Sequence, residues 1–349
     1  MIKEENIKVG ITLGDPNGIG GEIILKAFED PRMLELVTPV VFASTKLLSF
    51  HAKTFGIKTK IHGITSLDQV VHGKFNVLRL IKEPFHVNWG EVNSEAGELA
   101  VKSLAAATQA LKNNEIDVLV TAPINKESIH SDEFNFPGHT DYLNQELEGE
   151  SLMFMVSDEL RVGLLTDHVP VKNVPERINA KVIKTKIGTI KESLKKDFGI
   201  SRPKIAVLGI NPHVGDNGVI GTDDQDTLIP ALEELREDGN IIFGPYAADS
   251  FFGNKKYKEF DAILASYHDQ GLIPFKTIAF GKGVNYTAGL SHVRTSPDHG
   301  TGFDIAGKGE ANPASFIAAI HSAIHIYQQR SEYEILNKNP LKKLSRKRR

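Results

Sequence analysis

The chain of 349 residues has an apolar content of 40% and a formal net charge of −3, enough material for one large α/β unit or about two domains. The slightly acidic balance argues against a general nucleic-acid or membrane-surface binder, which would carry a basic excess. The absence of cysteine excludes disulfides, thiolate metal sites and a cysteine nucleophile. No apolar signal core and no run approaching ~18 apolar residues is present, so we expect a soluble, cytoplasmic protein.

Short apolar runs alternate with amphipathic stretches from end to end. We predict strands at residues 7–14, 39–43, 117–121, 152–156, 162–166, 204–209 and 261–266. Helical spacing and start signals such as Pro175 predict helices at residues 21–28, 94–113, 175–195, 222–237 and 313–329. This alternation indicates an α/β protein with a largely parallel sheet and helices on both faces.

Three histidines, His168, His213 and His268, each follow a predicted strand and precede turn-forming residues. Ligands of α/β folds collect at the carboxyl ends of strands. A single histidine there is more often a hydrogen-bonded core residue, but three in equivalent positions predict a shared metal. Three imidazoles with an open fourth position suit Zn²⁺ or Co²⁺. Such an ion can bind a substrate hydroxyl and make its proton easier to remove.

Aspartates lie beside two of these histidines. Asp167 and Asp269 would orient the imidazoles, or one of them would act as a base, and the alternative is that they cap turns. Asp249 and Asp269 are the candidates for the base that takes the hydroxyl proton, and neither ranks above the other.

Anion-binding groups are predicted in two further segments. Residues 136–143 read as a loop entering a helix, where backbone N–H groups with His139 and Thr140 would hold a phosphate or carboxylate. The alternative there is an ordinary N-cap by Thr140. Lys276, Asn285 and Arg294 add a cation, an amide and a guanidinium, whose fork suits an anionic oxygen pair. Surface solvation is the alternative for each of these three.

Two glycine-rich segments resemble nucleotide loops only partly. Residues 14–21 lack the glycine spacing of a dinucleotide fingerprint. Residues 302–309 match a P-loop except at Gly309, where a Ser or Thr would bind Mg²⁺, and no strand signal precedes them. A nucleoside-triphosphate kinase is therefore disfavoured.

Taken together, these motifs closely resemble the 4-hydroxythreonine-4-phosphate dehydrogenase family of pyridoxal 5′-phosphate biosynthesis, over nearly the whole chain. The resemblance is carried by residues 14–20, 121–126, 138–140, the three histidine segments and residues 304–309. The last segment also looks like the nucleotide-binding turn of isocitrate and isopropylmalate dehydrogenases, to which the family is related in fold. The family usually carries Ala at the position of Asn17 and Pro at that of Gly21.

The resemblance implies two α/β/α domains around a cleft, without a Rossmann fingerprint. Residues 1–130 plus 280–349 would form the nucleotide-binding side, and residues 131–279 the metal-binding and dimerisation side. It also implies a homodimer whose active sites take residues from both subunits.

The resemblance further implies the roles of the site residues. A divalent metal, Zn²⁺ first with Co²⁺ or Mg²⁺ as alternatives, would be held by His168, His213 and His268. A small phosphorylated substrate would be contacted by His139, Thr140, Lys276, Asn285 and Arg294. NAD or NADP would lie against the loop 299–312, with contacts from His299, Gly300, Thr301, Asp304 and Asn312.

The reaction implied is oxidation of 4-phosphooxy-L-threonine at its C3 hydroxyl. Decarboxylation to 3-amino-2-oxopropyl phosphate would follow, with the metal, or Lys276 acting as an acid, stabilising the enolate. Two alternatives stay open: a paralogue that oxidises 4-phospho-threonate or 4-phospho-erythronate, and a non-catalytic metal-binding module.

Overall fold

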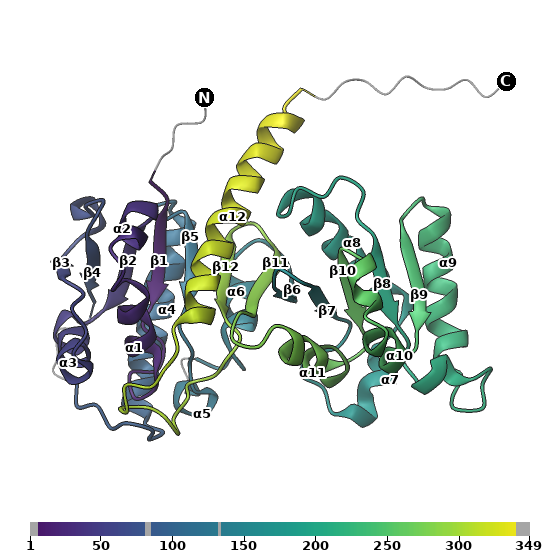
Figure 1. Ribbon diagram of the computed structural model, residues 1–349, viewed down its shortest axis with the longest axis horizontal. Coiled ribbons are helices and arrows are strands. Elements are labelled where there is room, and N and C mark those ends of the chain that lie inside the picture. The colour runs from purple at the N-terminus through teal and green to yellow at the C-terminus, as the bar shows by residue number, and fades with distance from the viewer. Residues whose placement is uncertain (1–5, 81–84, 132–133, 340–349) are drawn as a thin grey trace.

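The computed structural model describes residues 6–80, 85–131 and 134–339 (Figure 1). The basic run at residues 341–349, which we expect to be a solvated tail, lies outside these ranges. Within them, none of the helices is both long enough and apolar enough to cross a membrane.

The core of the fold is one sheet of 12 strands in the order β3-β4-β2-β1-β5-β12-β11-β6-β7-β10-β8-β9. The strands are β1 (Lys8–Thr12), β2 (Thr38–Ala43), β3 (Ile61–Ile64), β4 (Phe75–Arg79), β5 (Val118–Thr121), β6 (Gly149–Val156), β7 (Arg161–Leu164), β8 (Ile205–Leu208), β9 (Ile242–Tyr246), β10 (Ala262–Ala265), β11 (Val284–Leu290) and β12 (Val293–Pro297).

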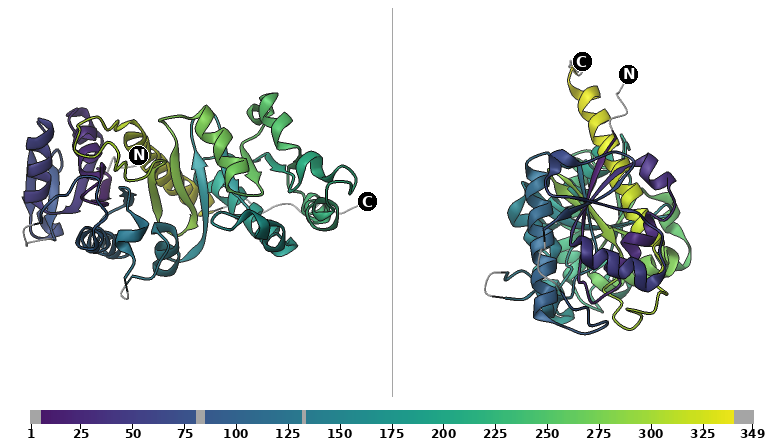
Figure 2. Two further views of the ribbon diagram at one scale, coloured as in Figure 1. Left: turned by 90° about the horizontal axis from the view of Figure 1, so that it is seen from below. Right: turned by 90° about the vertical axis from the view of Figure 1, so that its left-hand side faces the viewer.

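Helices pack on both sides of this sheet (Figure 2). They are α1 (Gly20–Ala27), α2 (Arg32–Leu36), α3 (Thr45–Phe55), α4 (Ser94–Lys112), α5 (Lys126–Ile129), α6 (His139–Glu146), α7 (Val174–Arg177), α8 (Ala180–Lys196), α9 (Ile229–Glu237), α10 (Ala248–Gly253), α11 (His268–Ile278) and α12 (Ala314–Asn337). Single turns lie at η1 (Leu67–Gln69), η2 (Val171–Asn173), η3 (Pro212–Gly215), η4 (Asp224–Leu228) and η5 (Lys256–Glu259).

Strand direction reverses in the middle of the sheet. The strands from β3 to β5 and β12 pair in parallel, and so do β7, β10, β8 and β9. Between these two groups, β11 pairs antiparallel with β12 and with β6, and β6 pairs antiparallel with β7. Because three successive antiparallel pairs separate them, β5 and β7 run in opposite directions. The central strands β6 and β11 therefore join two parallel groups whose carboxyl ends face opposite ways.

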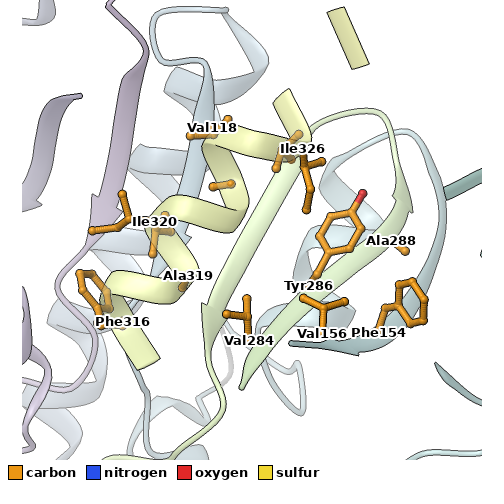
Figure 3. Packing of buried hydrophobic residues seen from close by; sticks show 14 of the residues in the cluster. Val118, Phe154, Val156, Val284, Tyr286, Ala288, Phe316, Ala319, Ile320 and Ile326 are labelled. Atoms are coloured by element: carbon orange, nitrogen blue, oxygen red, sulfur yellow. The ribbon is translucent and has the colours of Figure 1, made fainter. Parts of the chain in front are cut away.

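Helix α12 covers one face of this central region. Its buried residues Phe316, Ala319 and Ile320 pack toward Val118 and Val284 of the strands beneath (Figure 3). Burial of each large apolar side chain contributes roughly 1.5–3 kcal/mol. The helix thus holds together β5, β12 and β11, where the two parallel groups meet (Figure 1).

The structure confirms the predicted α/β class and places every predicted strand. The predicted helix 175–195 is wrong at its start, because the chain breaks after α7 and α8 begins at Ala180. Asn179, in extended backbone, caps α8 by accepting the N–H of Val182 at 3.1 Å. The predicted helix 222–237 opens with the π-helical turn η4 before α9. The division into two domains stays a prediction.

One further expectation is wrong. The glycine-rich residues 302–309 were expected to follow no strand, yet β12 ends shortly before them at Pro297. No helix follows the segment directly, since residues 303–309 form turns. The segment therefore still differs from a P-loop, which leads from a strand straight into a helix.

Candidate functional site

A cavity of about 330 Å³ lies where the two strand groups meet. It collects nine of the residues predicted from sequence, namely His139, Thr140, His168, His268, Lys276, Asn285, Arg294, His299 and Gly300. These residues come from segments far apart in the chain. The fold therefore brings together groups that were predicted from separate sequence motifs.

The central strands form part of the cavity wall. Met155 of β6 and Asn285 of β11 are directly paired in the sheet register, and both line the cavity. Side chains two positions apart on a strand share a face, and Met153 accordingly lines it as well. The cavity therefore lies on one face of the β6–β11 pair, and helix α12 covers the other face.

Helix α6 presents its first residues to the cavity. Gly138 is the N-cap and makes no side-chain capping bond, so the alternative role of Thr140 as the N-cap is wrong. His139 and Thr140 instead occupy the first turn, where backbone N–H groups and the helix dipole favour an anion. Both side chains line the cavity.

Arg294 is the main electrostatic feature of the site. It is only 2% exposed, so surface solvation is wrong for this residue. Its guanidinium donates to Thr121 Oγ1 at 2.6 and 3.1 Å and to Thr287 Oγ1 at 3.0 Å. It forms no ion pair with any carboxylate of the described residues. Burial lowers the pKa of Arg294 to about 9, which still leaves it charged at neutral pH. A buried charge of this kind needs a counter-ion.

Three buried polar atoms around the cavity also lack hydrogen-bond partners within the described residues. They are Nε2 of His139, Oδ1 of Asn285 and Nε2 of His299. Buried polar atoms are nearly always satisfied, so a polar ligand in the cavity would complete them. Burial, together with the charge of Arg294, holds the pKa of His139 well below its usual value. His139 is therefore a neutral imidazole that can accept or donate one hydrogen bond.

The three predicted metal-binding histidines follow three neighbouring parallel strands, β7, β10 and β8. The ring centroids of His168 and His268 are 6.2 Å apart, and both residues line the cavity. Nδ1 of His268 lies 2.7 Å from Oδ1 of Asp269, which leaves Nε2 available as a ligand atom. His213 does not line the cavity. The described residues contain no group of three or more side chains already arranged around a metal position.

The backbone at His213 is unusual. His213 and Val214 have φ values of 52° and 58°, in the left-handed region. A β-branched residue such as Val214 rarely adopts this conformation, and such strain is often found at functional sites. The donor set of this chain thus offers two imidazoles in the cavity and a third on a strained turn at the end of the next strand.

Other predicted residues lie outside the cavity. Asp249 is in the first turn of α10 and does not line it, while Asp269 contacts His268. The assignment of the base therefore stays a prediction. Sequence reasoning missed Lys126, Asp141 and Asp298, which do line the cavity. Lys126 could have been found, because it ends the motif that follows strand β5.

The loop 299–312 is supported by the glycine-rich segment near the N-terminus. The N–H of Ile19 donates to the carbonyl of Thr301 at 2.9 Å. The side chain of Asn17 donates to the carbonyl of Glu91 at 3.0 Å and accepts the N–H of Asn88 at 2.9 Å.

Among the predicted cofactor contacts, His299 and Gly300 line the cavity, whereas Thr301, Asp304 and Asn312 do not. The loop therefore begins at the cavity with His299 and Gly300 and continues outside it, where Thr301 is hydrogen-bonded to Ile19 of the N-terminal segment.

Comparisons with known proteins identify the family of this chain. The family pattern of the pyridoxal phosphate biosynthetic protein PdxA matches residues 35–323. A 4-hydroxythreonine-4-phosphate dehydrogenase of Bacteroides thetaiotaomicron is 44% identical over 344 residues, covering 98% of this chain and 94% of that protein. One of Sulfurihydrogenibium sp. is 43% identical and covers 91% of this chain and 98% of that protein.

A solved structure is also similar. The crystal structure of a 4-hydroxythreonine-4-phosphate dehydrogenase from Klebsiella pneumoniae superposes with a TM-score of 0.81 at 33% identity, covering 93% of this chain and 99% of that chain. The residues that the family pattern matches, 35–323, include the whole cavity wall and all three histidine segments. This chain belongs to the pyridoxal phosphate biosynthetic protein PdxA family.

Proposed function

We propose that this protein oxidises 4-phosphooxy-L-threonine at its C3 hydroxyl with NAD or NADP. Loss of carbon dioxide from the resulting β-keto acid then yields 3-amino-2-oxopropyl phosphate, in pyridoxal 5′-phosphate biosynthesis. The observation that carries the proposal is the buried guanidinium of Arg294, which forms no ion pair within the described residues, in a cavity that also holds His168 and His268. Such a cavity suits an anionic substrate whose reacting hydroxyl sits beside imidazole ligands.

Binding of the anionic ends is assigned to the cationic and polar lining. Arg294 and the first turn of α6, with His139 and Thr140, hold one anionic group, because a guanidinium fork and helix N–H groups both favour oxyanions. Lys276 and Asn285 complete the contacts. Fixing both ends of a short substrate places its reacting carbon in one position, which lowers the barrier.

The chemical step needs two groups that the chain would bind. A divalent metal, Zn²⁺ first with Co²⁺ or Mg²⁺ as alternatives, would polarise the substrate hydroxyl and later the enolate oxygen, and NAD or NADP would accept the hydride. Asp269 or Asp249 takes the hydroxyl proton. When the carboxylate leaves as carbon dioxide, its electron pair forms the enolate, and Lys276 supplies the proton that quenches it. His299 and Gly300 face the cofactor.

We further propose a cytoplasmic homodimer with shared active sites. His168 and His268 line one cavity while His213 does not, so a second subunit would complete the ligand set. Large exposed apolar side chains lie close to each histidine in sequence, namely Val171, Val219 and Ile273, and Phe280 is 88% exposed. Exposed apolar groups gathered on the segments of a site are typical of an interface.

Two measurements test the proposal. Steady-state NADH or NADPH formation is compared for 4-phosphooxy-L-threonine and 4-phospho-threonate, with a preference for the hydroxy acid refuting the vitamin assignment. Metal content and turnover are then measured for His213→Ala. We expect both to fall sharply, and a variant that keeps full metal content and full turnover would refute the three-histidine site. A protein that reduces neither NAD nor NADP with either substrate and added metal would be a non-catalytic module.

A further inference from the structure

A second cavity, of about 470 Å³, lies away from the proposed active site. Its polar lining comprises Ser157, Asp158, Arg161, Lys282, His321, Ser322 and His325. We call it the back groove. Its volume falls within the roughly 300–1,000 Å³ of small-molecule sites.

The back groove shares two strands with the active-site cavity but lies on their other face. Met155 and Asn285 form a registered pair and line the active-site cavity. The next pair in register, Val156 and Val284, lines the back groove. Adjacent residues of a strand point to opposite faces. Figure 3 shows Val156 and Val284 on the side of the sheet that faces helix α12. The two cavities are therefore separated by a single layer of strand.

Arg161 is the back-groove residue whose buried side-chain nitrogen lacks a partner within the described residues. Its guanidinium lies 4.5 Å from the ring centroid of Phe198 and donates one bond, at 3.3 Å, to the carbonyl of Asp261. Its Nε is buried and has no partner within the described residues. Burial lowers the pKa of Arg161. Arg161 is partly buried, and the charges of Asp261 and Asp158 stabilise it only from a distance, without an ion pair within the described residues. A bound anion would supply the missing partner for its buried Nε.

The rest of the lining is rich in donors. His321 and His325 lie one turn apart on α12, so both face the same side of the helix. Lys282 adds an ammonium group and Ser322 a hydroxyl, against the single carboxylate of Asp158. Neither Arg161 nor Lys282 forms an ion pair in the part of the chain that the structure describes. The donors reach the groove from two separate elements, α12 and the β7–β11 region.

We propose that the back groove is a binding site for a phosphate group, either as inorganic phosphate or as part of a phosphorylated metabolite. A guanidinium, an ammonium, two imidazoles and a hydroxyl that converge from different directions suit an anion with three or more acceptor oxygens. A carboxylate, with two oxygens in one plane, would satisfy fewer of them. An anion held there would tie Arg161 of β7 to helix α12, directly behind the active-site strands.

The test follows His321 and His325 directly, so that phosphate in the active-site cavity cannot be mistaken for phosphate here. The protein is labelled with ¹³C in its histidine rings, and the two resonances are assigned with the single variants His321→Gln and His325→Gln. Inorganic phosphate is then titrated at constant pH and ionic strength, with acetate and glycerol 3-phosphate in parallel. These arms distinguish a carboxylate site, a phosphate-ion site and a phosphate-ester site.

We expect saturable shifts of both resonances with phosphate or its ester, and a dissociation constant raised about tenfold in Lys282→Gln, as for loss of one charged hydrogen bond. Arg161→Gln should weaken binding similarly if it folds, and Lys282→Gln, at an exposed position, keeps the test valid if it does not. The matched control is Lys60→Gln, near the far end of the sheet. No saturable shift, equal binding of acetate, or equal affinity in Lys282→Gln would overturn the proposal. The outcome does not depend on turnover, so it is separate from that of the proposed function.

Discussion

The buried carboxylate of Glu22 accepts a hydrogen bond of 2.9 Å from the backbone N–H of Ala311, across 289 positions of the chain. Lys26 forms an ion pair of 2.7 Å with the same carboxylate. Its ammonium also donates to the carbonyl oxygens of Gly309 at 2.9 Å and Ala311 at 2.8 Å. Helix α1 therefore fixes the far end of the loop that we assign to the cofactor.

The first prediction concerns this attachment. Lys26→Met leaves the Glu22 carboxylate buried and unpaired, so we expect the free energy of unfolding to fall by about 2 kcal/mol, discounted for partial exposure of the lysine. We also expect weaker binding of NADH, because the loop loses its two hydrogen bonds from the Lys26 ammonium.

The chain offers a direct optical probe of that loop. Trp89 is the only tryptophan, and its ring packs on Gly307, where an added Cβ would lie only 2.6 Å away. NADH binding can therefore be followed by quenching of Trp89 fluorescence, with Lys53→Met as the control. Unchanged NADH affinity in Lys26→Met would show that the attachment does not position the cofactor loop.

The second prediction concerns pH. His51 is fully buried, and neither ring nitrogen has a partner within the described residues. Burial lowers the pKa of His51 to about 4, so the unfolded chain binds a proton below pH ~6.5 that the folded chain does not. The contribution of neutral His51 to the free energy of unfolding is therefore fully present above pH ~6.5. It is lost as the pH falls toward 4, which lowers the free energy of unfolding by about 3 kcal/mol.

Urea unfolding of His51→Phe at pH 7, 6 and 5 checks this sign. The variant should lose less stability than the parent on acidification. Some loss should remain, because the lowered pKa of His139 acts in the same direction. His130→Gln, at an exposed position, should behave like the parent. If His51→Phe and the parent lose stability in parallel, the buried imidazole is not responsible.

The third prediction separates stability from function at Arg294. Arg294→Met removes a buried charge that has no carboxylate partner, so the unfolding free energy of the unliganded protein should stay the same or rise. The KM for the phosphorylated substrate should increase about 100-fold, since charged hydrogen bonds of about 1.5–3 kcal/mol each are lost. Chemical denaturation and initial-rate kinetics measure the two effects. A less stable variant with an unchanged KM would contradict the anion-binding role.

The fourth prediction concerns a buried network behind the sheet. Asp197 accepts hydrogen bonds from Arg330 Nε at 2.7 Å, from the Tyr286 hydroxyl at 2.6 Å and from Ser193 Oγ at 2.6 Å. Arg330→Met would leave this carboxylate buried and unpaired, which should lower the free energy of unfolding by about 3–5 kcal/mol.

The matched control for Arg330→Met is a nearby surface pair. Lys196 lies 3.6 Å from Glu334, whose side chain is 69% exposed, so Lys196→Met should change stability by less than about 1 kcal/mol. Urea unfolding measures the free energy of unfolding of both variants. Equal losses in Arg330→Met and Lys196→Met would mean that the buried Asp197 network does not stabilise the fold more than a surface ion pair.

Seven of the strands could be predicted from sequence because their apolar runs are short, buried and bounded by turns, whereas strands β3, β4 and β9, at or next to the sheet edges, were not predicted. Strands β7, β8 and β10 are of this kind, and the histidines at their ends were identified for the same reason. Strands β11 and β12 were missed, since their Asn, Thr, Ser and Arg residues break the apolar pattern. The reversal of strand direction depends on these two strands, so it could not be predicted from the sequence.

The site was predictable in its residue types but not in its geometry. Arg294 could be nominated as an anion contact, but its burial could not, because an arginine on an isolated strand pattern is normally solvent-exposed. The position of His213 depends on the left-handed backbone at His213 and Val214, which no local sequence signal predicts at a β-branched residue. Asp249 shows the converse, since it was a candidate for the base but α10 places it outside the cavity.

The most direct test of the proposed oxidative decarboxylation measures both products of one reaction. Metal-loaded protein is incubated with 4-phosphooxy-L-threonine and excess NAD or NADP, and reduced cofactor and carbon dioxide are quantified together. We predict one reduced cofactor and one carbon dioxide per substrate consumed. No reduced cofactor from this substrate, with 4-phospho-threonate oxidised under the same conditions, would contradict the account.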